Sequence, residues 1–224
     1  VAVLVTTSKA AALAAVIAVL RPSMSSVLAL PALTVGLAAV ALTTMILGAS
    51  VALRQDRALG LVAWSTIAQA GWVLLPLVAL AEQGAQAGVA YLCVYAAATV
   101  ALLAGIAARG GDGELSAYRG LIRRDPLTGG AMAFALLVLA GLPPGVVGLI
   151  AKIIALRPLT TTAHQALPIV AVLAVIAVAL GIAVYLRWLV ILVARPEDTP
   201  GAAAPRAWAP RIVLVAASVT LVVL

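Results

Sequence analysis

The stretch that decides the fold is Leu139-Ala-Gly-Leu-Pro-Pro-Gly-Val-Val-Gly-Leu-Ile-Ala-Lys152, which lies inside the apolar run 127–156. A straight helix over that run would be about 45 Å long at 1.5 Å per residue, whereas the hydrocarbon core of a bilayer is about 30 Å thick. The two consecutive prolines also remove backbone donors and clash with the preceding turn. The sequence therefore predicts a discontinuous membrane helix, broken at Gly141, Pro143, Pro144 and Gly145.

Composition extends this conclusion to the whole chain. Of its 224 residues, 65% are hydrophobic and only 9% are charged, and the mean hydropathy is +1.23. Soluble domains have about a quarter charged residues, so this chain could not cover its own surface in water. Segments of about ten residues with alternating polarity, which are typical of an outer-membrane barrel, do not occur. The predicted fold class is an all-α polytopic membrane protein.

Apolar runs separated by charge, Gly and Pro predict about seven crossings. The runs are 1–20, 27–50, 58–80, 88–108, 127–156, 166–194 and 208–224. We expect one transmembrane domain over residues 1–224 and no separate soluble domain. The chain begins at Val1 within an apolar run and without the basic leader of a signal peptide. We therefore expect it to be part of a longer polypeptide.

The loop arginines predict the orientation. Only Arg21 and Arg157 follow crossings one, three and five. The loops after crossings two, four and six, the last counted as 195–211, hold the other nine: Arg54, Arg57, Arg109, Arg119, Arg123, Arg124, Arg195, Arg206 and Arg211. Basic loops remain cytoplasmic, which predicts a cytoplasmic N-terminal end and an external C-terminal end in a bacterial cell membrane. The same rule explains the net charge of +7, which therefore gives no support for nucleic-acid binding.

The charged segment 113–125 is too polar to cross the membrane. Leu115, Tyr118, Leu121 and Ile122 fall at helical spacing within it. This pattern favours a short interfacial helix with its arginines at the lipid headgroups, and a plain solvated loop is the alternative. Cys93 and His164 are the single cysteine and histidine, so zinc, haem and iron–sulfur ligation are poorly supported.

Three basic residues remain inside the crossings: Lys9, Lys152 and Arg187. A charge within the bilayer is costly and is by default a candidate functional residue. Snorkelling to the interface is the competing interpretation for each. For Arg187, which lies between Tyr185 and Trp188, an aromatic-belt anchor and a pathway role are equally supported, and an anchor would tolerate lysine. For Lys152 we expect burial among four aliphatic neighbours, Leu149, Ile150, Ile153 and Ile154.

Neutral polar residues form stripes at helical spacing on two crossings. Ser65, Gln69 and Trp72 occupy positions i, i+4 and i+7, and Tyr91, Tyr95 and Thr99 occupy positions i, i+4 and i+8. Such stripes usually make hydrogen bonds between membrane helices, although they could instead line a water-filled proton path. The candidate polar path comprises Thr6, Ser65, Gln69, Tyr91 and Tyr95. These features favour ion transport over a structural anchor and name no substrate.

Four motifs in this order carry a resemblance: Thr7-Ser-Lys-Ala-Ala-Ala12, Trp64-Ser-Thr-Ile-Ala-Gln-Ala-Gly-Trp72, the segment 114–126 and the segment 139–152. Together they resemble the subunit N family of bacterial NADH–quinone oxidoreductases (respiratory complex I), which are antiporter-like membrane subunits. The resemblance runs from residue 1 to about 198. It implies the C-terminal half of such a subunit: the second of two inverted repeats and the closing helices.

By this resemblance, Lys9 matches the lysine that links two half-channels and Lys152 matches the broken-helix lysine. Both would be proton-relay groups. The family commonly has His where this chain has Gln69, which cannot titrate, and Phe where it has Ile153. The first inverted repeat, with its buried lysine and glutamate, has no counterpart here. The chain alone should therefore not form a complete transport path.

The leading hypothesis is a non-redox, proton-translocating subunit of an NADH:quinone oxidoreductase. This resemblance implies as partners the other membrane subunits of complex I, the lipid bilayer and the missing N-terminal half of the same subunit. We expect no cofactor on this chain, so that NADH, flavin, iron–sulfur clusters and quinone would bind other subunits. The alternatives are a subunit of a multisubunit cation/proton antiporter and a non-conducting structural segment.

Overall fold

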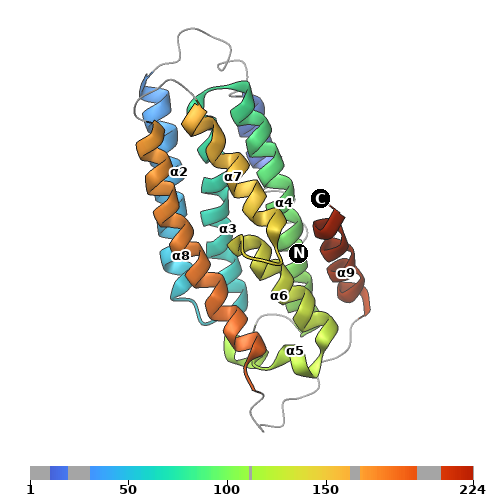
Figure 1. The fold of residues 1–224 in the computed structure, drawn as a ribbon. Helices are drawn as coiled ribbons and strands as arrows, with labels where there is room; N and C mark the ends of the chain where they lie inside the picture. Colours follow the sequence, from blue (N-terminus) through green and yellow to red (C-terminus); the bar gives the residue numbers. More distant parts are fainter. Residues whose placement is uncertain (1–10, 20–30, 111–112, 162–166, 196–207, 224) are drawn as a thin grey trace.

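The computed structural model describes residues 11–19, 31–110, 113–161, 167–195 and 208–223. Residues 11–19 are helical, and an elongated bundle follows (Figure 1). Its first elements are α2 (Pro31–Leu53), α3 (Ala58–Leu74), η1 (Leu75–Ala79) and α4 (Glu82–Ala108). The later elements are η2 (Leu115–Tyr118), α5 (Leu121–Arg124), α6 (Pro126–Ala140), α7 (Val146–Thr161), α8 (Leu167–Val193) and α9 (Trp208–Val223).

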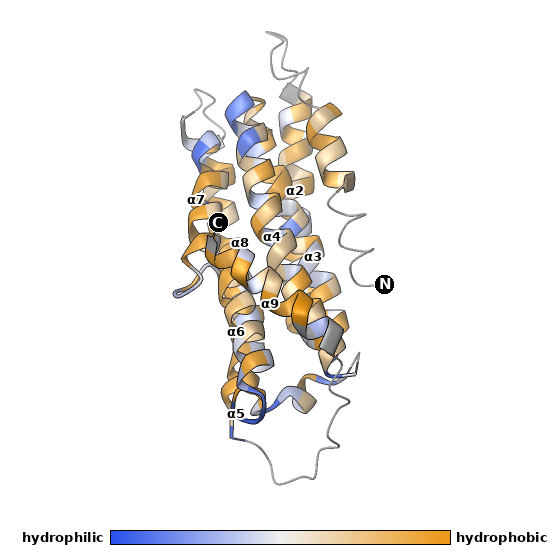
Figure 2. Ribbon diagram, turned by 90° about the vertical axis from the view of Figure 1, so that its right-hand side faces the viewer, coloured by the Kyte–Doolittle hydropathy of each residue, from blue (hydrophilic) through white to orange (hydrophobic). Residues whose placement is uncertain are grey.

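The helices have the lengths and surfaces of membrane spans. Four segments of the described residues are long and apolar enough to cross a bilayer: Ala32–Leu53, Ala58–Ala79, Glu82–Ala108 and Pro168–Val193. Apolar residues dominate the helices (Figure 2), and large aliphatic side chains such as Val172 and Val190 on α8 are exposed. This arrangement confirms the all-α polytopic class. The count of seven crossings stays a prediction, because residues 1–10 are outside the described ranges.

The fourth crossing begins earlier than the sequence suggested. We expected it to start at 88, and α4 instead starts at Glu82. A Cβ atom on Gly84 would meet the carbonyl oxygen of Pro76, so α4 begins in direct contact with η1. Leu80 turns the chain between them with a φ of 47°. The glycine permits a tighter turn than apolar periodicity alone indicates.

The discontinuous crossing is present as predicted. Helix α6 has 15 residues and α7 has 16, so neither could span the bilayer alone. They meet at mid-height of the bundle (Figure 1). Helix α6 starts with Pro126 after Asp125, whose carboxylate accepts from the Thr128 amide, as an N-cap does. It ends at Gly141, whose φ of +76° suits glycine better than any other residue.

Close backbone contact fixes the two half-helices against each other. A Cβ atom on Gly145 or Gly148 would overlap the backbone of Val138. The first turn of α7 therefore packs directly on the last turns of α6. This contact explains why the residues after the break include glycines as well as prolines.

Three loops gather at one end of the bundle. The Ala58 amide donates to Gly113 O (3.0 Å), and the Leu115 amide donates to Asp56 O (2.7 Å). The Gly120 amide donates to Ile191 O (3.0 Å) near the end of α8. The loops after crossings two and four thus share one end with the end of α8, as the loop arginines suggested. In segment 113–125 the structure has two short pieces, η2 and α5, in place of one helix, and their interfacial location stays a prediction.

Candidate functional site

Lys152 is a buried cation at the break between α6 and α7. Its side chain is only 5% exposed. Its Nζ donates to Leu139 O (2.8 Å) and to Ala140 O (2.6 Å). These carbonyls belong to the last turn of α6, where backbone acceptors lack partners within the helix. The break in the helix therefore supplies the acceptors that compensate for burial of the lysine.

Gly141 leaves space for this lysine as well as turning the chain. A Cβ atom there would lie 3.3 Å from Lys152 Cδ and 3.4 Å from Nζ. The indole ring of Trp72 lies on another side of the amine, with 5.7 Å between Nζ and the ring centroid. A cation within about 6 Å of an aromatic face is attracted to it. Among the described residues, no carboxylate forms an ion pair with Lys152.

The surroundings of Lys152 differ from those expected from the sequence. We expected burial among Leu149, Ile150, Ile153 and Ile154, but all four are exposed, by 40% to 58%. The inward face of α7 instead carries small or polar residues, including Ala151, Lys152 and Ala155. Aliphatic side chains on a membrane helix are stable against lipid, so hydrophobicity does not by itself indicate the buried face.

The two carbonyl bonds allow Lys152 to hold or release a proton without losing its position. An ammonium has three N–H donors, and two of them are used by Leu139 and Ala140. A neutral amine keeps two donors and gains one lone pair. Both carbonyl bonds can therefore persist in either state, which leaves only the third position on Nζ without a carbonyl partner.

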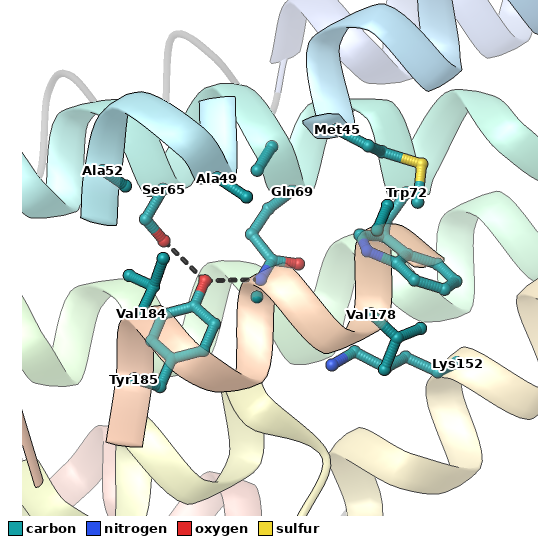
Figure 3. A pocket seen from close by; sticks show the side chains of 13 residues that line it. Met45, Ala49, Ala52, Ser65, Gln69, Trp72, Lys152, Val178, Val184 and Tyr185 are labelled. Atoms are coloured by element: carbon teal, nitrogen blue, oxygen red, sulfur yellow. Dashed lines mark hydrogen bonds between the residues drawn. The ribbon is translucent and has the colours of Figure 1, made fainter. Parts of the chain in front are cut away.

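A buried hydrogen-bonded network joins α3, α4 and α8. The hydroxyl of Tyr185 lies 2.6 Å from Ser65 Oγ, and Gln69 Nε2 donates to the same hydroxyl at 2.6 Å. The Tyr91 hydroxyl donates to Gln69 Oε1. Figure 3 shows Tyr185 reaching from α8 toward Ser65 and Gln69 on α3, with Lys152 on the side nearer Trp72. Tyr91 also stacks on Trp72, with 5.7 Å between ring centroids.

One cavity connects this network with Lys152. Its lining consists of Met45, Ala49, Ala52, Ser65, Ala68, Gln69, Trp72, Lys152, Ala177, Val178, Gly181, Val184 and Tyr185. The cavity offers about 10 Å³ to the centre of a water molecule, which is close to the smallest volume that holds one. Because the wall includes an amine, an amide and two hydroxyls, a water there would have the polar partners it needs.

The structure thus brings together part of the predicted polar path. Ser65, Gln69 and Tyr91 lie in one network, while Tyr95 is buried in the core without a hydrogen bond to that network among the described residues. Lys9 and Thr6 lie outside the described residues. Their role in proton transfer stays a prediction for Ser65, Gln69 and Tyr91, although the structure places these residues near Lys152.

Sequence reasoning missed Tyr185, which we had interpreted only as a flank of Arg187. The sequence did contain a signal that could have indicated Tyr185. Gly181, Tyr185 and Trp188 occupy positions i, i+4 and i+7 on α8, the spacing that drew attention to Ser65, Gln69 and Trp72. Tyr185 and Trp188 are both at most 2% exposed, and Gly181 lines the cavity. A polar residue on such a stripe is a candidate for contact between helices.

Comparison with known proteins gives consistent relatives. The chain is 43% identical over 202 residues to NADH-quinone oxidoreductase subunit N of Salinispora tropica, covering 83% of this chain and 37% of that protein. It is 39% identical over 189 residues to subunit N 2 of Streptomyces griseus, covering 78% and 35%. The chain therefore spans a little over a third of the length of these relatives.

Solved structures give the same fold. A chain of respiratory complex I from Thermus thermophilus is 34% identical, with a TM-score of 0.67, covering 84% of this chain and 42% of that one. A chain of the Mrp complex from Dietzia sp. has the same TM-score at 21% identity, which indicates likeness of fold alone. Residues 1–181 match the family described as NADH:quinone oxidoreductase/Mrp antiporter, TM. The chain belongs to the NADH:quinone oxidoreductase/Mrp antiporter transmembrane family.

Proposed function

We propose that this chain is the part of a proton-translocating membrane subunit of an NADH:quinone oxidoreductase in which Lys152 takes up and releases protons. The observation that carries the proposal is the geometry of Lys152: a buried amine held by two backbone carbonyls at a broken helix, beside a cavity whose wall includes Ser65, Gln69 and Tyr185. Broken helices are where membrane transporters place ion sites. The relatives named as subunit N support the identity of the assembly.

The proposed step is a proton transfer between Lys152 and cavity water. The N–H of Nζ that is not bonded to a carbonyl gives its proton to a water, and the nitrogen keeps the electron pair. Return of a proton restores the ammonium. Ser65 and Tyr185 offer hydroxyls to that water from the same wall. Gln69 cannot titrate, so it acts by orienting the two tyrosines through its amide.

The remaining parts of the proposal concern the assembly. The redox cofactors and quinone would bind other subunits, which would drive this one by conformational or electrostatic coupling. The chain would lie in a bacterial cell membrane with the shared loop end in the cytoplasm. Lys9 would link this half to the rest of the subunit.

Substitution of Lys152 tests the proposal in the full-length subunit within the assembled complex. Arginine remains protonated and cannot release a proton, and alanine has no amine. We expect both Lys152→Arg and Lys152→Ala to reduce proton transfer to below about a tenth, a loss typical of a missing proton-transfer group. The measurement is acidification of membrane vesicles together with the rate of quinone reduction.

Arg157→Lys is the matched control, because Arg157 is exposed on the same helix, and it should retain normal pumping. Normal acidification in Lys152→Arg would show that position 152 needs only a fixed positive charge, and the relay role would be rejected.

An antiporter subunit is the second candidate function, because the family description includes the Mrp antiporter. This function predicts proton release that depends on external sodium or potassium and persists without NADH or quinone. Acidification that requires NADH and is indifferent to these cations would exclude it.

A further inference from the structure

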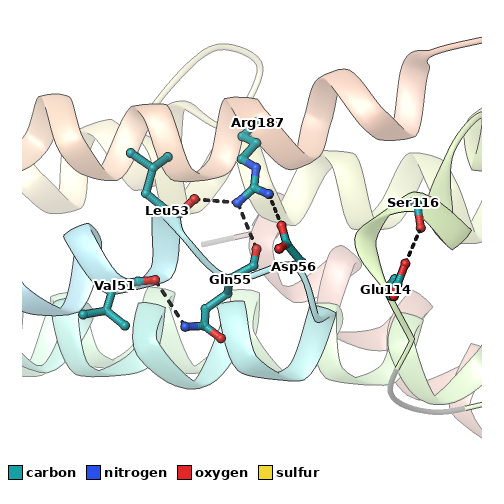
Figure 4. A network of polar contacts seen from close by, with 7 residues as sticks. All are labelled: Val51, Leu53, Gln55, Asp56, Glu114, Ser116 and Arg187. Atoms are coloured by element: carbon teal, nitrogen blue, oxygen red, sulfur yellow. Dashed lines mark hydrogen bonds and ion pairs between the residues drawn. The ribbon is translucent and has the colours of Figure 1, made fainter.

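Arg187 on α8 is bound to the turn that joins α2 to α3. Its Nη1 donates to the carbonyl oxygens of Leu53 and Gln55, the latter at 2.9 Å. Its Nη2 lies 2.6 Å from Asp56 Oδ1. Figure 4 shows the guanidinium directed at all three acceptors. A residue that only anchored α8 at the interface would instead direct its charged group into water.

The guanidinium group suits this turn for a definite reason. Helix α2 ends at Leu53, and the last carbonyls of a helix have no partners within it. A planar guanidinium offers several donors in a fixed fork, whereas a lysine ammonium is a point charge on a flexible stem. Asp56 is 80% exposed, and exposed ion pairs contribute little. The two carbonyl bonds are therefore the main part of the contact, and a lysine would not hold both carbonyls and the Asp56 carboxylate in one fixed geometry.

Two residues before Arg187, Tyr185 makes its contacts with Ser65 and Gln69 on α3. Residues two apart on a helix point in directions about 200° apart. The two side chains therefore leave α8 on different faces, one toward the turn after α2 and one toward α3. Together with the packing of α8 on α2 and α6, these contacts hold the rotation of α8 and its height relative to α3. Loss of the guanidinium contacts would leave the Tyr185 hydroxyl free to move from its two partners.

We propose that Arg187 is a positioning residue for the proton path: by binding the α2–α3 turn it keeps the Tyr185 hydroxyl at Ser65 and Gln69, beside the cavity of Lys152. This inference rests on the proposed function of Lys152. Arg187 does not line that cavity and does not exchange a proton. It acts through Tyr185, and it provides the link between the loop end of the bundle and the buried network.

A double-mutant cycle separates this role from general stabilisation. In the full-length subunit of the assembled complex, Arg187→Gln, Tyr185→Phe and the double variant are compared by protons released per NADH oxidised. We expect Arg187→Gln to lower this ratio by about two- to tenfold, the range for loss of one neutral hydrogen bond. If Arg187 acts through Tyr185, the double variant should equal Tyr185→Phe alone, because the position of a missing hydroxyl no longer matters.

Two further variants control the cycle. Arg54→Gln removes an exposed arginine from the same turn and should leave the ratio unchanged. Arg187→Lys keeps the charge and should restore only part of the ratio. It also replaces Arg187→Gln in the cycle if the glutamine variant does not assemble, as judged by the amount of complex on a native gel.

Multiplying effects in the double variant, or a normal ratio in Arg187→Gln, would overturn the positioning role. Lys152→Ala measured in parallel distinguishes this failure from failure of the proposed function. Impaired Lys152→Ala with normal Arg187→Gln rejects only the role of Arg187, whereas normal Lys152→Ala rejects the relay itself.

Discussion

Lys152 and Arg187 bind helix ends in the same way but lie in different surroundings. Each donates two hydrogen bonds to backbone carbonyls at or just after the C-terminus of another helix, α6 for Lys152 and α2 for Arg187. Cations are favourable there because the helix dipole is negative at that end. Lys152 is 5% exposed and has no carboxylate partner among the described residues, whereas Arg187 is 33% exposed and contacts Asp56.

This difference determines which of the two groups can exchange a proton. Arginine is effectively always protonated, so Arg187 can only hold its partners in place. The amine of Lys152 can lose a proton while keeping both carbonyl bonds, and it lines a cavity that Ser65, Gln69 and Tyr185 also line. The same type of contact thus fixes structure at the loop end and permits chemistry at mid-height. The three predictions below test the contacts that hold Lys152 and Arg187 in place.

The largest expected effect is on the packing that creates the Lys152 site. In Gly148→Ala the added methyl would overlap the carbonyl of Val138, so α7 must move away from α6. Overpacking of this kind costs about 1–3 kcal/mol. Gly181→Ala on the continuous α8 is the control, since nothing lies within 4 Å of its Cβ position. It should be neutral or stabilising by up to about 1 kcal/mol, because alanine favours a helix.

Unfolding of the full-length subunit by SDS in mixed micelles measures both variants. Equal stability of Gly148→Ala and Gly181→Ala would mean that the two half-helices are not held by close backbone contact. Close backbone packing would then not distinguish the broken crossing from the continuous helix α8.

The sequence was sufficient to predict the break because its causes are local. The consecutive Pro143 and Pro144 remove two backbone donors and clash with the preceding turn whatever surrounds them, and run length and charge indicated the membrane class. The gathering of the three basic loops also followed from counting, since alternate loops of a bundle must share an end. None of these conclusions required knowledge of which helices touch.

The contacts of the site could not be predicted in the same way. The acceptors of Lys152 are backbone oxygens. Every residue has one, so the sequence does not indicate which of them Lys152 contacts. The buried face of α7 was predicted wrongly because lipid and the protein interior are both apolar. Aliphatic residues such as Ile153 and Ile154 are stable in either environment. The partnership of Tyr185 with Gln69 joins residues 116 positions apart, and it depends on how α8 packs against α3.

A smaller effect is expected from Gly141→Ala. Gly141 has a φ of +76°, and the left-handed conformation costs other residues about 1–2 kcal/mol. The added methyl would also lie 3.4 Å from Lys152 Nζ and press on the amine. We expect lower stability together with lower acidification in vesicles. Gly130→Ala on α6 is the control, because its Cβ position is open and it should retain both. Normal acidification in Gly141→Ala would show that the Lys152 site tolerates displacement.

The smallest effect is expected from Asp56→Asn at the Arg187 site. The carboxylate is 80% exposed, and exposed ion pairs are worth about 0.2–1 kcal/mol. Asparagine keeps an oxygen that can still accept from Nη2, while the carbonyl bonds of Leu53 and Gln55 are unaffected. The midpoint of SDS unfolding should therefore change little, and its dependence on salt should weaken. Arg187→Gln should change the midpoint more than Asp56→Asn does, since it removes the fork that reaches both carbonyls. If Asp56→Asn lowered the midpoint as much as Arg187→Gln, the ion pair would be the main contact that holds the turn. Arg187 would then not be held mainly by backbone carbonyls, as Lys152 is.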